Sequence, residues 1–283
     1  MQTIQDRAAL RAALDPLRQA GETIALVPTM GALHDGHMAL VADARRRADH
    51  VVVSIFVNPK QFGPNEDYAA YPRPAAADAA KLTAAGVAFL WMPPVAEMYP
   101  EGFATTISVA GLPDRLCGAA RPGHFDGVTT VVAKLFNQVQ PDLAIFGEKD
   151  WQQLAIIRRM ATDLDMRLEV AGFPTQREED GLALSSRNAY LTDEERAAAV
   201  ALPRALGQAA RAMEAGTDVG KALAEIPVAL LKAGFASVDY AELVDADTLT
   251  PLAALDRPAR LLAAARIGKA RLIDNLPVAP TTR

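Results

Sequence analysis

The sequence predicts an α/β protein: a parallel β-sheet with crossover helices, followed by a smaller α+β domain. Apolar, β-branched runs alternate with helical patterns through the first 175 residues, which is typical of a parallel sheet. The pattern changes after residue 190, where an alanine-rich helix and two strand-like runs follow. With 283 residues, 51% hydrophobic and 22% charged, the chain is long enough for two globular domains, expected at 1–175 and 176–283.

The elements are predicted from hydrophobic periodicity and β-branched content. Strands are expected at 22–28, 50–57, 87–93, 105–109, 143–147 and 168–173, and helices at 4–20, 38–48, 75–85, 128–138 and 151–164. Further on, Thr192 stands three residues before Glu195, the spacing of a capping box that begins a long helix. Strands at 237–244 and 259–267 follow. Ligands bind at the carboxyl ends of parallel strands, so residues 28–37, 58–73 and 147–150 are the places to look for a site.

Composition excludes several classes of function. A net charge of −5 and a pI of about 5.5 do not fit a nucleic-acid binder, and the basic run at 45–47 is interpreted as a solvated helix face. A single cysteine, Cys117, permits no internal disulfide framework and suits a reducing compartment. Neither a signal-peptide pattern nor a run of 18 apolar residues is present, so we expect a cytoplasmic protein with no membrane partner.

Two of the four histidines lie on one turn, in "LVPTMGALHDGH" at 26–37. Asp35 is predicted as the N-cap of the helix that contains His37. A helix N-terminus presents unpaired N–H groups that suit phosphate, and both imidazoles can donate hydrogen bonds there. Gly36 leaves room for a ligand. A zinc site is the alternative, but neither a third ligand nor a glutamate between the histidines is nearby.

H-x-G-H at a strand-to-helix turn resembles the signature of the nucleotidylyltransferase and class I synthetase superfamily. The chain has no G-x-x-x-x-G-K-[ST] phosphate loop. The resemblance implies attack by a carboxylate or a phosphate on the α-phosphorus of a nucleotide, with release of pyrophosphate. It does not identify the acceptor.

Three further segments carry polar side chains past predicted strands. Gln61, in the long loop at 58–73, can both donate and accept, which suits a small substrate with hydroxyl and carboxylate groups. Lys149 can reach a phosphate, and Asp150 a ribose hydroxyl, with Gln153 on the same helix face. An ordinary polar loop and a solvated helix start are the respective alternatives.

The third segment, "LSSRN" at 184–188, can close over phosphates through two serines and a guanidinium, or be a plain surface turn. Arg121 is a candidate for a carboxylate or phosphate, with a solvated arginine as the alternative. His124 is equally compatible with packing at a helix entrance and with catalysis.

Together, "PTMGALHDGH", "SIFVNPKQFGPNEDYAAYPR", "RPGHFDGV", "FGEKDWQQL" and "LALSSRNAYL" resemble the pantothenate synthetase, or pantoate–β-alanine ligase, family. The motifs keep the family's order and spacing over about residues 3–275. The resemblance implies a homodimer with a Rossmann-like N-terminal domain and a smaller α+β C-terminal lid. It also implies that ATP and (R)-pantoate form pantoyl adenylate and pyrophosphate, after which β-alanine displaces AMP to give pantothenate. Mg²⁺ is expected with the ATP.

The resemblance also implies roles for individual residues. His34 and His37 match the phosphate-binding pair, with His37 as a proton donor, and the catalytic set is completed by Lys149 and Arg187. ATP contacts are implied at Met30, Gly31, Ala32, Leu33, His34, Asp35, Gly36, His37, Gly147, Glu148, Lys149, Asp150, Gln176, Leu184, Ser185, Ser186 and Arg187. Pantoate and β-alanine contacts are implied at Gln61, Gln153, Asn58, Tyr71 and Arg121.

The sequence departs from the family at two positions. The helix after "YPR" keeps only Asp78 of several acidic residues linked to Mg²⁺, so Asp78 is the one candidate metal ligand and metal held by ATP phosphates is the safer expectation. Gln176 stands where valine is common, at a backbone contact to adenine. The rival functions are another H-x-G-H adenylyl- or cytidylyltransferase and an inactive nucleotide sensor.

Overall fold

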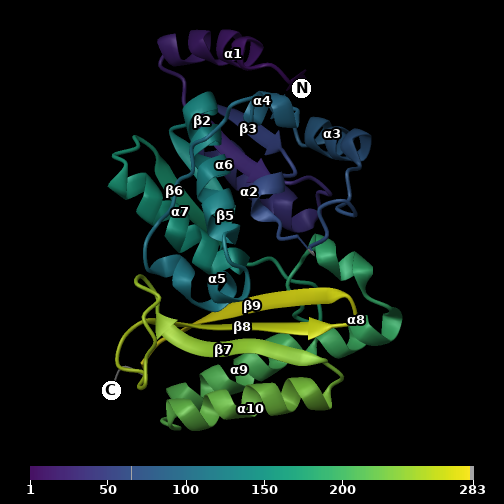
Figure 1. The fold of residues 1–283 in the computed structure, drawn as a ribbon, viewed down its shortest axis with the longest axis vertical. Coiled ribbons are helices and arrows are strands. Elements are labelled where there is room, and N and C mark those ends of the chain that lie inside the picture. The colour runs from purple at the N-terminus through teal and green to yellow at the C-terminus, as the bar shows by residue number, and fades with distance from the viewer. Residues whose placement is uncertain (65, 281–283) are drawn as a thin grey trace. The chain divides into compact units, whose positions relative to one another are not determined.

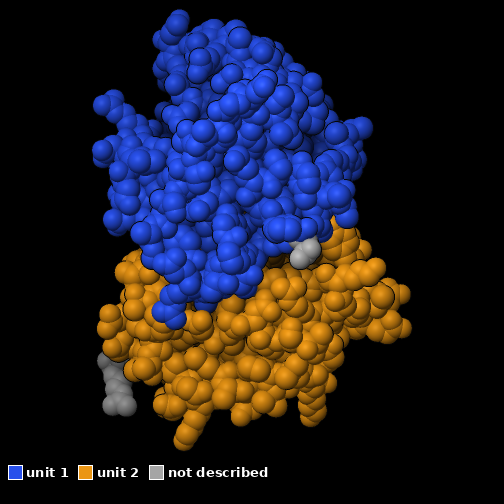
Figure 2. Space-filling view, viewed as in Figure 1, with its two compact units in different colours: residues 1–148, 156–174 blue, residues 149–155, 175–283 orange. Residues whose placement is uncertain are grey.

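The structure is a computed structural model that describes residues 1–64 and 66–280. It divides into two compact units, coloured separately in Figure 2. Unit 1 comprises Met1–Glu148 and Ile156–Pro174, and unit 2 comprises Lys149–Ala155 and Thr175–Arg283. Each unit is built on its own sheet.

Unit 1 contains a parallel six-stranded sheet in the order β1-β4-β3-β2-β5-β6 (Figure 1). Without the edge strand β1, this is the 3-2-1-4-5 order of doubly wound nucleotide-binding sheets. The chain moves outward one way from β2 to β3 and the other way to β5, so the carboxyl ends of β2 and β5 flank the switch point where such folds bind ligands. The strands are β1 Gln2–Ile4, β2 Ile24–Thr29, β3 His50–Ile55, β4 Phe89–Trp91, β5 Leu143–Gly147 and β6 Glu169–Phe173.

Both faces of this sheet are covered, as its continuous apolar strands require. Ala25 and Val27 of β2 pack in one cluster with Leu40 and Val41 of α2, while Leu26, which points to the other face, is also fully buried. The α/β prediction with a Rossmann-like sheet is therefore confirmed. The helices of the first 174 residues are α1 Arg7–Gln19, α2 Asp35–Arg47, α3 Ala75–Ala84, α4 Val95–Met98, α5 Leu116–Ala120, α6 His124–Val139 and α7 Trp151–Asp163.

Unit 2 is an antiparallel three-stranded sheet in the order β7-β8-β9, with α9 packed on β8 and β9, and α10 packed on α9 and β7 (Figure 1). Its core joins Leu206 and Leu230 of the helices to Leu261 and Ala263 of β8. The elements are α8 Asp193–Ala199, α9 Ala201–Glu214, α10 Val219–Lys232, β7 Ser237–Asp245, β8 Ala259–Ile267 and β9 Ala270–Val278. Across the described part of the chain, no helix has the length and apolar character needed to cross a bilayer.

Several sequence expectations need correction or completion. Residues 105–109 form no strand, because side chains of α6 satisfy the backbone there: Thr130 Oγ1 accepts from the Ile107 amide at 2.9 Å, and Thr129 Oγ1 donates to the Ile107 carbonyl at 2.5 Å. The N-terminal helix begins at Arg7 rather than at residue 4, because Asp6 caps it and residues 2–4 pair with β4. The sequence does not predict the short elements β1, α4 and α5, nor the longer α10 and β9.

The expected long helix after residue 192 is two helices that meet at Val200. Its capping box is confirmed: Thr192 Oγ1 accepts from the Glu195 amide at 3.2 Å, and Glu195 Oε2 accepts from the Thr192 amide at 2.9 Å. Pro203 has no N–H for the carbonyl of Ala199, which explains why the helical bonding is interrupted there.

Candidate active site

The H-x-G-H turn connects β2 to α2 and brings its two histidines together. The N-cap of α2 is His34, not Asp35 as the sequence rules suggest. The backbone amide of His34 donates to Nδ1 of His37 at 3.3 Å, so the His37 imidazole serves where a glutamate or glutamine side chain of a capping box usually does. The two ring centroids are 4.0 Å apart. Both imidazoles therefore stand at the positive end of the α2 dipole.

A buried carboxylate on α3 holds the turn that leads to these histidines. Asp78, 1% exposed, accepts from the amides of Ala32 at 2.8 Å and Leu33 at 2.9 Å. Lys81, one turn further along α3, donates to the Leu33 carbonyl at 2.5 Å. Gly31 and Ala32 both have positive φ, at 84° and 53°, so this grip fixes a backbone conformation that side chains disfavour.

The same bonds bear on Asp78 as a metal ligand. Each of its oxygens already accepts from a backbone amide. The described residues contain no group of three or more His, Cys, Asp or Glu side chains that could hold a metal ion. Metal binding by Asp78 stays a prediction, whereas its role in shaping the loop is visible in the contacts.

The loop after β3 places Gln61 beside the first loop. Gln61 Nε2 lies 3.3 Å from Sδ of Met30, and its Oε1 accepts from Asn58 Nδ2 at 3.0 Å. The structure thus brings Gln61 into contact with Met30, a predicted site residue from the loop of the H-x-G-H motif.

Asn58 is 1% exposed and fully bonded within unit 1. Its Nδ2 also donates to the Gly127 carbonyl at 3.0 Å, while its Oδ1 accepts from the Lys60 amide at 3.2 Å and from the Tyr99 hydroxyl at 2.8 Å. With both donors and both lone pairs in use, Asn58 orients Gln61, and direct contact with a substrate stays a prediction. Burial raises the pKa of Tyr99, which keeps its hydroxyl protonated as a donor.

An ion pair also holds the loop that follows β3. Arg121 donates from Nε to Glu66 Oε1 at 2.7 Å and from Nη2 to Oε2 at 2.6 Å, a bidentate pair. Hydrogen bonds from Arg121 lower the pKa of Glu66 to about 2. Arg121 also contacts Nε2 of His124 at 2.9 Å and the Gln61 carbonyl at 3.2 Å. Tyr71, 6% exposed, packs edge-on against Phe62.

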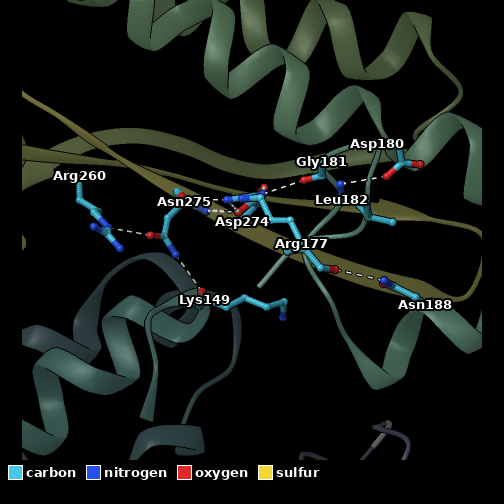
Figure 3. Close-up of polar contacts among 10 residues, drawn as sticks. Lys149, Arg177, Asp180, Gly181, Leu182, Asn188, Arg260, Asp274 and Asn275 are labelled. Atoms are coloured by element: carbon cyan, nitrogen blue, oxygen red, sulfur yellow. Dashed lines mark hydrogen bonds and ion pairs between the residues drawn. The ribbon is translucent and has the colours of Figure 1, made fainter. Parts of the chain in front are cut away.

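In unit 2, a polar network fixes the start of α7 (Figure 3). Asn275 donates to the Lys149 carbonyl at 2.9 Å and accepts from Arg260 Nε at 2.7 Å, and the Arg260 guanidinium stacks 3.7 Å from the Trp151 ring centroid. The Lys149 side chain extends away from Asn275 in this view. The other residues predicted in this segment are placed as follows. Gly147 is the last residue of β5, and Glu148 follows it. Asp150 is exposed, and Gln153 is half-buried on α7.

Ser186 and Arg187 lie in a short 3-10 helix, Ser186–Tyr190, and Ser185 is its N-cap. Ser185 Oγ accepts from the Arg187 amide at 3.3 Å, and the carbonyl of Gln176 accepts from the Leu184 amide at 2.9 Å. Ser185 and Lys149 line one small cavity of about 10 Å³, so unit 2 brings these two predicted residues together.

Sequence reasoning missed the residues that anchor this segment. Arg177 pairs with Asp274 through two bonds of 2.8 Å and donates to the Gly181 carbonyl at 3.0 Å (Figure 3). Asp274 and Asn275 are each 2% exposed. The available signal was an adjacent acid and amide inside the apolar run "RLIDNLPV", since buried polar side chains need partners.

A family model described as pantoate-beta-alanine ligase matches residues 2–277. The pantothenate synthetase of Sphingopyxis alaskensis is 64% identical over 278 residues, which is 98% of this chain and 100% of that protein. The crystal structure of pantothenate synthetase from Thermus thermophilus is 52% identical with a TM-score of 0.94, covering 99% of this chain and 100% of that one.

A second solved structure shows ligands on a relative. The pantoate-beta-alanine ligase of Francisella tularensis, complexed with beta-gamma ATP and beta-alanine, is 34% identical with a TM-score of 0.83. The match covers 98% of this chain and 97% of that one.

Proposed function

The chain belongs to the pantoate-beta-alanine ligase family, and from this premise we propose that it condenses (R)-pantoate with β-alanine to pantothenate at the expense of ATP. The observation that carries the proposal is the paired imidazoles of His34 and His37 at the α2 N-terminus, in a chain that matches the family over its whole length. The pantoate carboxylate attacks the α-phosphorus of ATP, and the bond to the pyrophosphate leaving group breaks. The amine of β-alanine then attacks the acyl carbon, loses a proton and displaces AMP.

The first step needs hydrogen-bond donors and positive charge, which the two histidines and the side chains of Lys149 and Arg187 can supply. Negative charge builds on the phosphate oxygens in the transition state, and donors fixed in place stabilise it without reorganisation. We assign His34 and His37 to the phosphates, with His37 able to donate a proton to the leaving pyrophosphate. Lys149 and Arg187 supply fixed positive charge, and Arg187 does so with a planar fork.

The remaining contacts are proposed from the family motifs. ATP is assigned to the segments 30–37, 147–150 and 184–187 and to the backbone of Gln176. Pantoate and β-alanine are assigned to Gln61 and Gln153, together with Asn58, Tyr71 and Arg121. We propose 1–175 as the domain that binds ATP and pantoate, and 176–283 as a lid, since excluding water protects an acyl adenylate from hydrolysis.

Mg²⁺ enters this proposal with the nucleotide. We assign the ion mainly to the ATP phosphates, because Mg²⁺ commonly binds through substrate phosphates with few protein carboxylates. When bound there, the ion neutralises phosphate charge. A homodimer and a cytoplasmic location are proposed on the family resemblance, and light scattering at micromolar concentrations tests the dimer.

The test is pyrophosphate release from ATP and Mg²⁺ with (R)-pantoate, with and without β-alanine, in the wild type and His37→Ala. We expect release that requires pantoate, accelerates with β-alanine and falls by about two to three orders of magnitude in the variant, as for loss of a transition-state donor. Release with other acceptors but not with pantoate would favour another H-x-G-H adenylyltransferase. ATP binding without any release would favour an inactive nucleotide sensor.

A further inference from the structure

A third histidine, outside the H-x-G-H motif, holds the backbone of Gln61. His124 is the first residue of α6, and its Nδ1 lies 2.8 Å from the Gln61 carbonyl oxygen. Arg121 Nη2 approaches the same oxygen at 3.2 Å, and Arg121 Nη1 lies 2.9 Å from Nε2 of His124. The Gln61 carbonyl oxygen therefore accepts from both His124 and Arg121, and these two side chains also contact each other.

The partners determine which ring nitrogen of His124 carries the proton. A carbonyl oxygen only accepts, so Nδ1 must be the donor, and a guanidinium only donates, so Nε2 must accept. The imidazole is thus held as one neutral tautomer by Gln61 and Arg121. The bidentate bond to Glu66 in turn fixes the guanidinium.

The side chain of Gln61 is oriented from the opposite end. Asn58 Nδ2 binds Gln61 Oε1 at 3.0 Å, which turns the Gln61 amide nitrogen toward Met30 in the H-x-G-H loop. With its carbonyl held by His124 and Arg121 and its amide oxygen held by Asn58, Gln61 has little freedom in either backbone or side chain. Such preorganisation is what a binding group needs to hold a small substrate in register.

We propose that His124 is a positioning residue for pantoate: through the Gln61 carbonyl it sets where the Gln61 amide meets the substrate, without touching the reacting atoms. The inference rests on the proposed function, in which Gln61 contacts pantoate. Arg121, which the proposed function also assigns to the substrate, supports this role by bonding both to Nε2 of His124 and to the Gln61 carbonyl.

Steady-state kinetics of variants at His124, Gln61 and His50 test this. His124→Ala removes the donor, and His124→Asn restores it, because the asparagine Nδ2 is attached to Cγ as Nδ1 is. Gln61→Ala is the reference for loss of the substrate contact. His50→Ala is the matched control, since His50 pairs with Glu22 on the surface at the start of β3.

We expect His124→Ala to raise the KM for pantoate about three- to tenfold, the size of one lost hydrogen bond, and to leave the KM for ATP unchanged. His124→Asn should recover most of the loss, and His50→Ala should match the wild type. If the alanine variant fails to fold, His124→Asn against His124→Gln decides, because glutamine has no donor on Cγ and should give the higher KM.

The outcomes separate this inference from the proposed function. A raised KM in Gln61→Ala with none in His124→Ala overturns the positioning role alone. Equal effects on ATP and pantoate, or no recovery with asparagine, also overturn it, because they would mark a merely structural residue. An unchanged KM for pantoate in Gln61→Ala removes the substrate role of Gln61 and the inference with it.

Discussion

The loops that follow β2 and β3 are both held by side chains from elsewhere in unit 1, but by different chemistry. The first loop is gripped by Asp78, a carboxylate 1% exposed that accepts from the backbone amides of Ala32 and Leu33. The second is gripped by the ion pair of Glu66 and Arg121, whose side chains are 28% and 17% exposed.

The difference predicts different sensitivities. A buried carboxylate bonded to backbone amides is barely screened by salt, and removing it leaves donors unsatisfied at full desolvation cost. A partly exposed ion pair contributes less and responds to ionic strength and pH. The grip on the loop assigned to ATP is therefore expected to be insensitive to salt, whereas the ion pair that holds the loop assigned to pantoate is expected to respond to salt and pH.

The largest expected effect comes from Asp78→Ala. Two buried amides lose their acceptor, so we expect the free energy of unfolding to fall by about 2–4 kcal/mol, measured by urea denaturation. The KM for ATP should rise more than the KM for pantoate. The matched control is Asp256→Ala, which removes a carboxylate from an exposed ion pair with Arg257. If Asp78→Ala proved as stable as Asp256→Ala and bound ATP normally, Asp78 would not be what holds the first loop in place.

A smaller and pH-dependent effect is expected for Glu66→Gln. The pKa of Glu66 is lowered in the folded state from 4.5 to about 2, chiefly by the hydrogen bonds from Arg121. A depressed folded-state pKa contributes stability that is complete above about pH 4.5 and is lost as the pH falls toward about 2. The wild type should therefore lose more stability than Glu66→Gln across that window.

The measurement is denaturant unfolding at both ends of the window, with Glu225→Gln on the exposed face of α10 as the control. We expect a difference of about 1 kcal/mol or less at neutral pH, since the pair is partly exposed, with added salt reducing it further. Parallel pH curves for the wild type and Glu66→Gln would show that the ion pair does not hold the second loop.

Much of the fold follows from the sequence because its signals are local. The β-branched run at 50–57 predicts β3, and the Thr192–Glu195 spacing predicts the start of α8. Where the prediction failed, a distant or unusual group replaced the expected one. The side chains of Thr129 and Thr130 satisfy the backbone of Ile107, so the β-branched run at 105–109 makes no strand. The run that forms β9 contains a buried acid and amide, which hide a strand from apolar patterning.

In the candidate site, too, residues with a local sequence signal could be predicted and residues that act from a distance could not. The H-x-G-H motif, Gln61 and Lys149 could be found because each lies just past a predicted strand. The support for these residues could not, because it comes from far along the chain: Asp78 is 45 residues from Leu33, and His124 is 63 residues from Gln61. No local pattern indicates which buried carboxylate will meet which backbone amide.

The proposed function depends on one step, the formation of pantoyl adenylate before β-alanine reacts. Exchange of radiolabelled pyrophosphate into ATP, measured with (R)-pantoate and Mg²⁺ in the absence of β-alanine, tests it most directly. We expect exchange that requires pantoate and is lost in His37→Ala. Exchange that appears only when β-alanine is added, or that proceeds equally without pantoate, would contradict it.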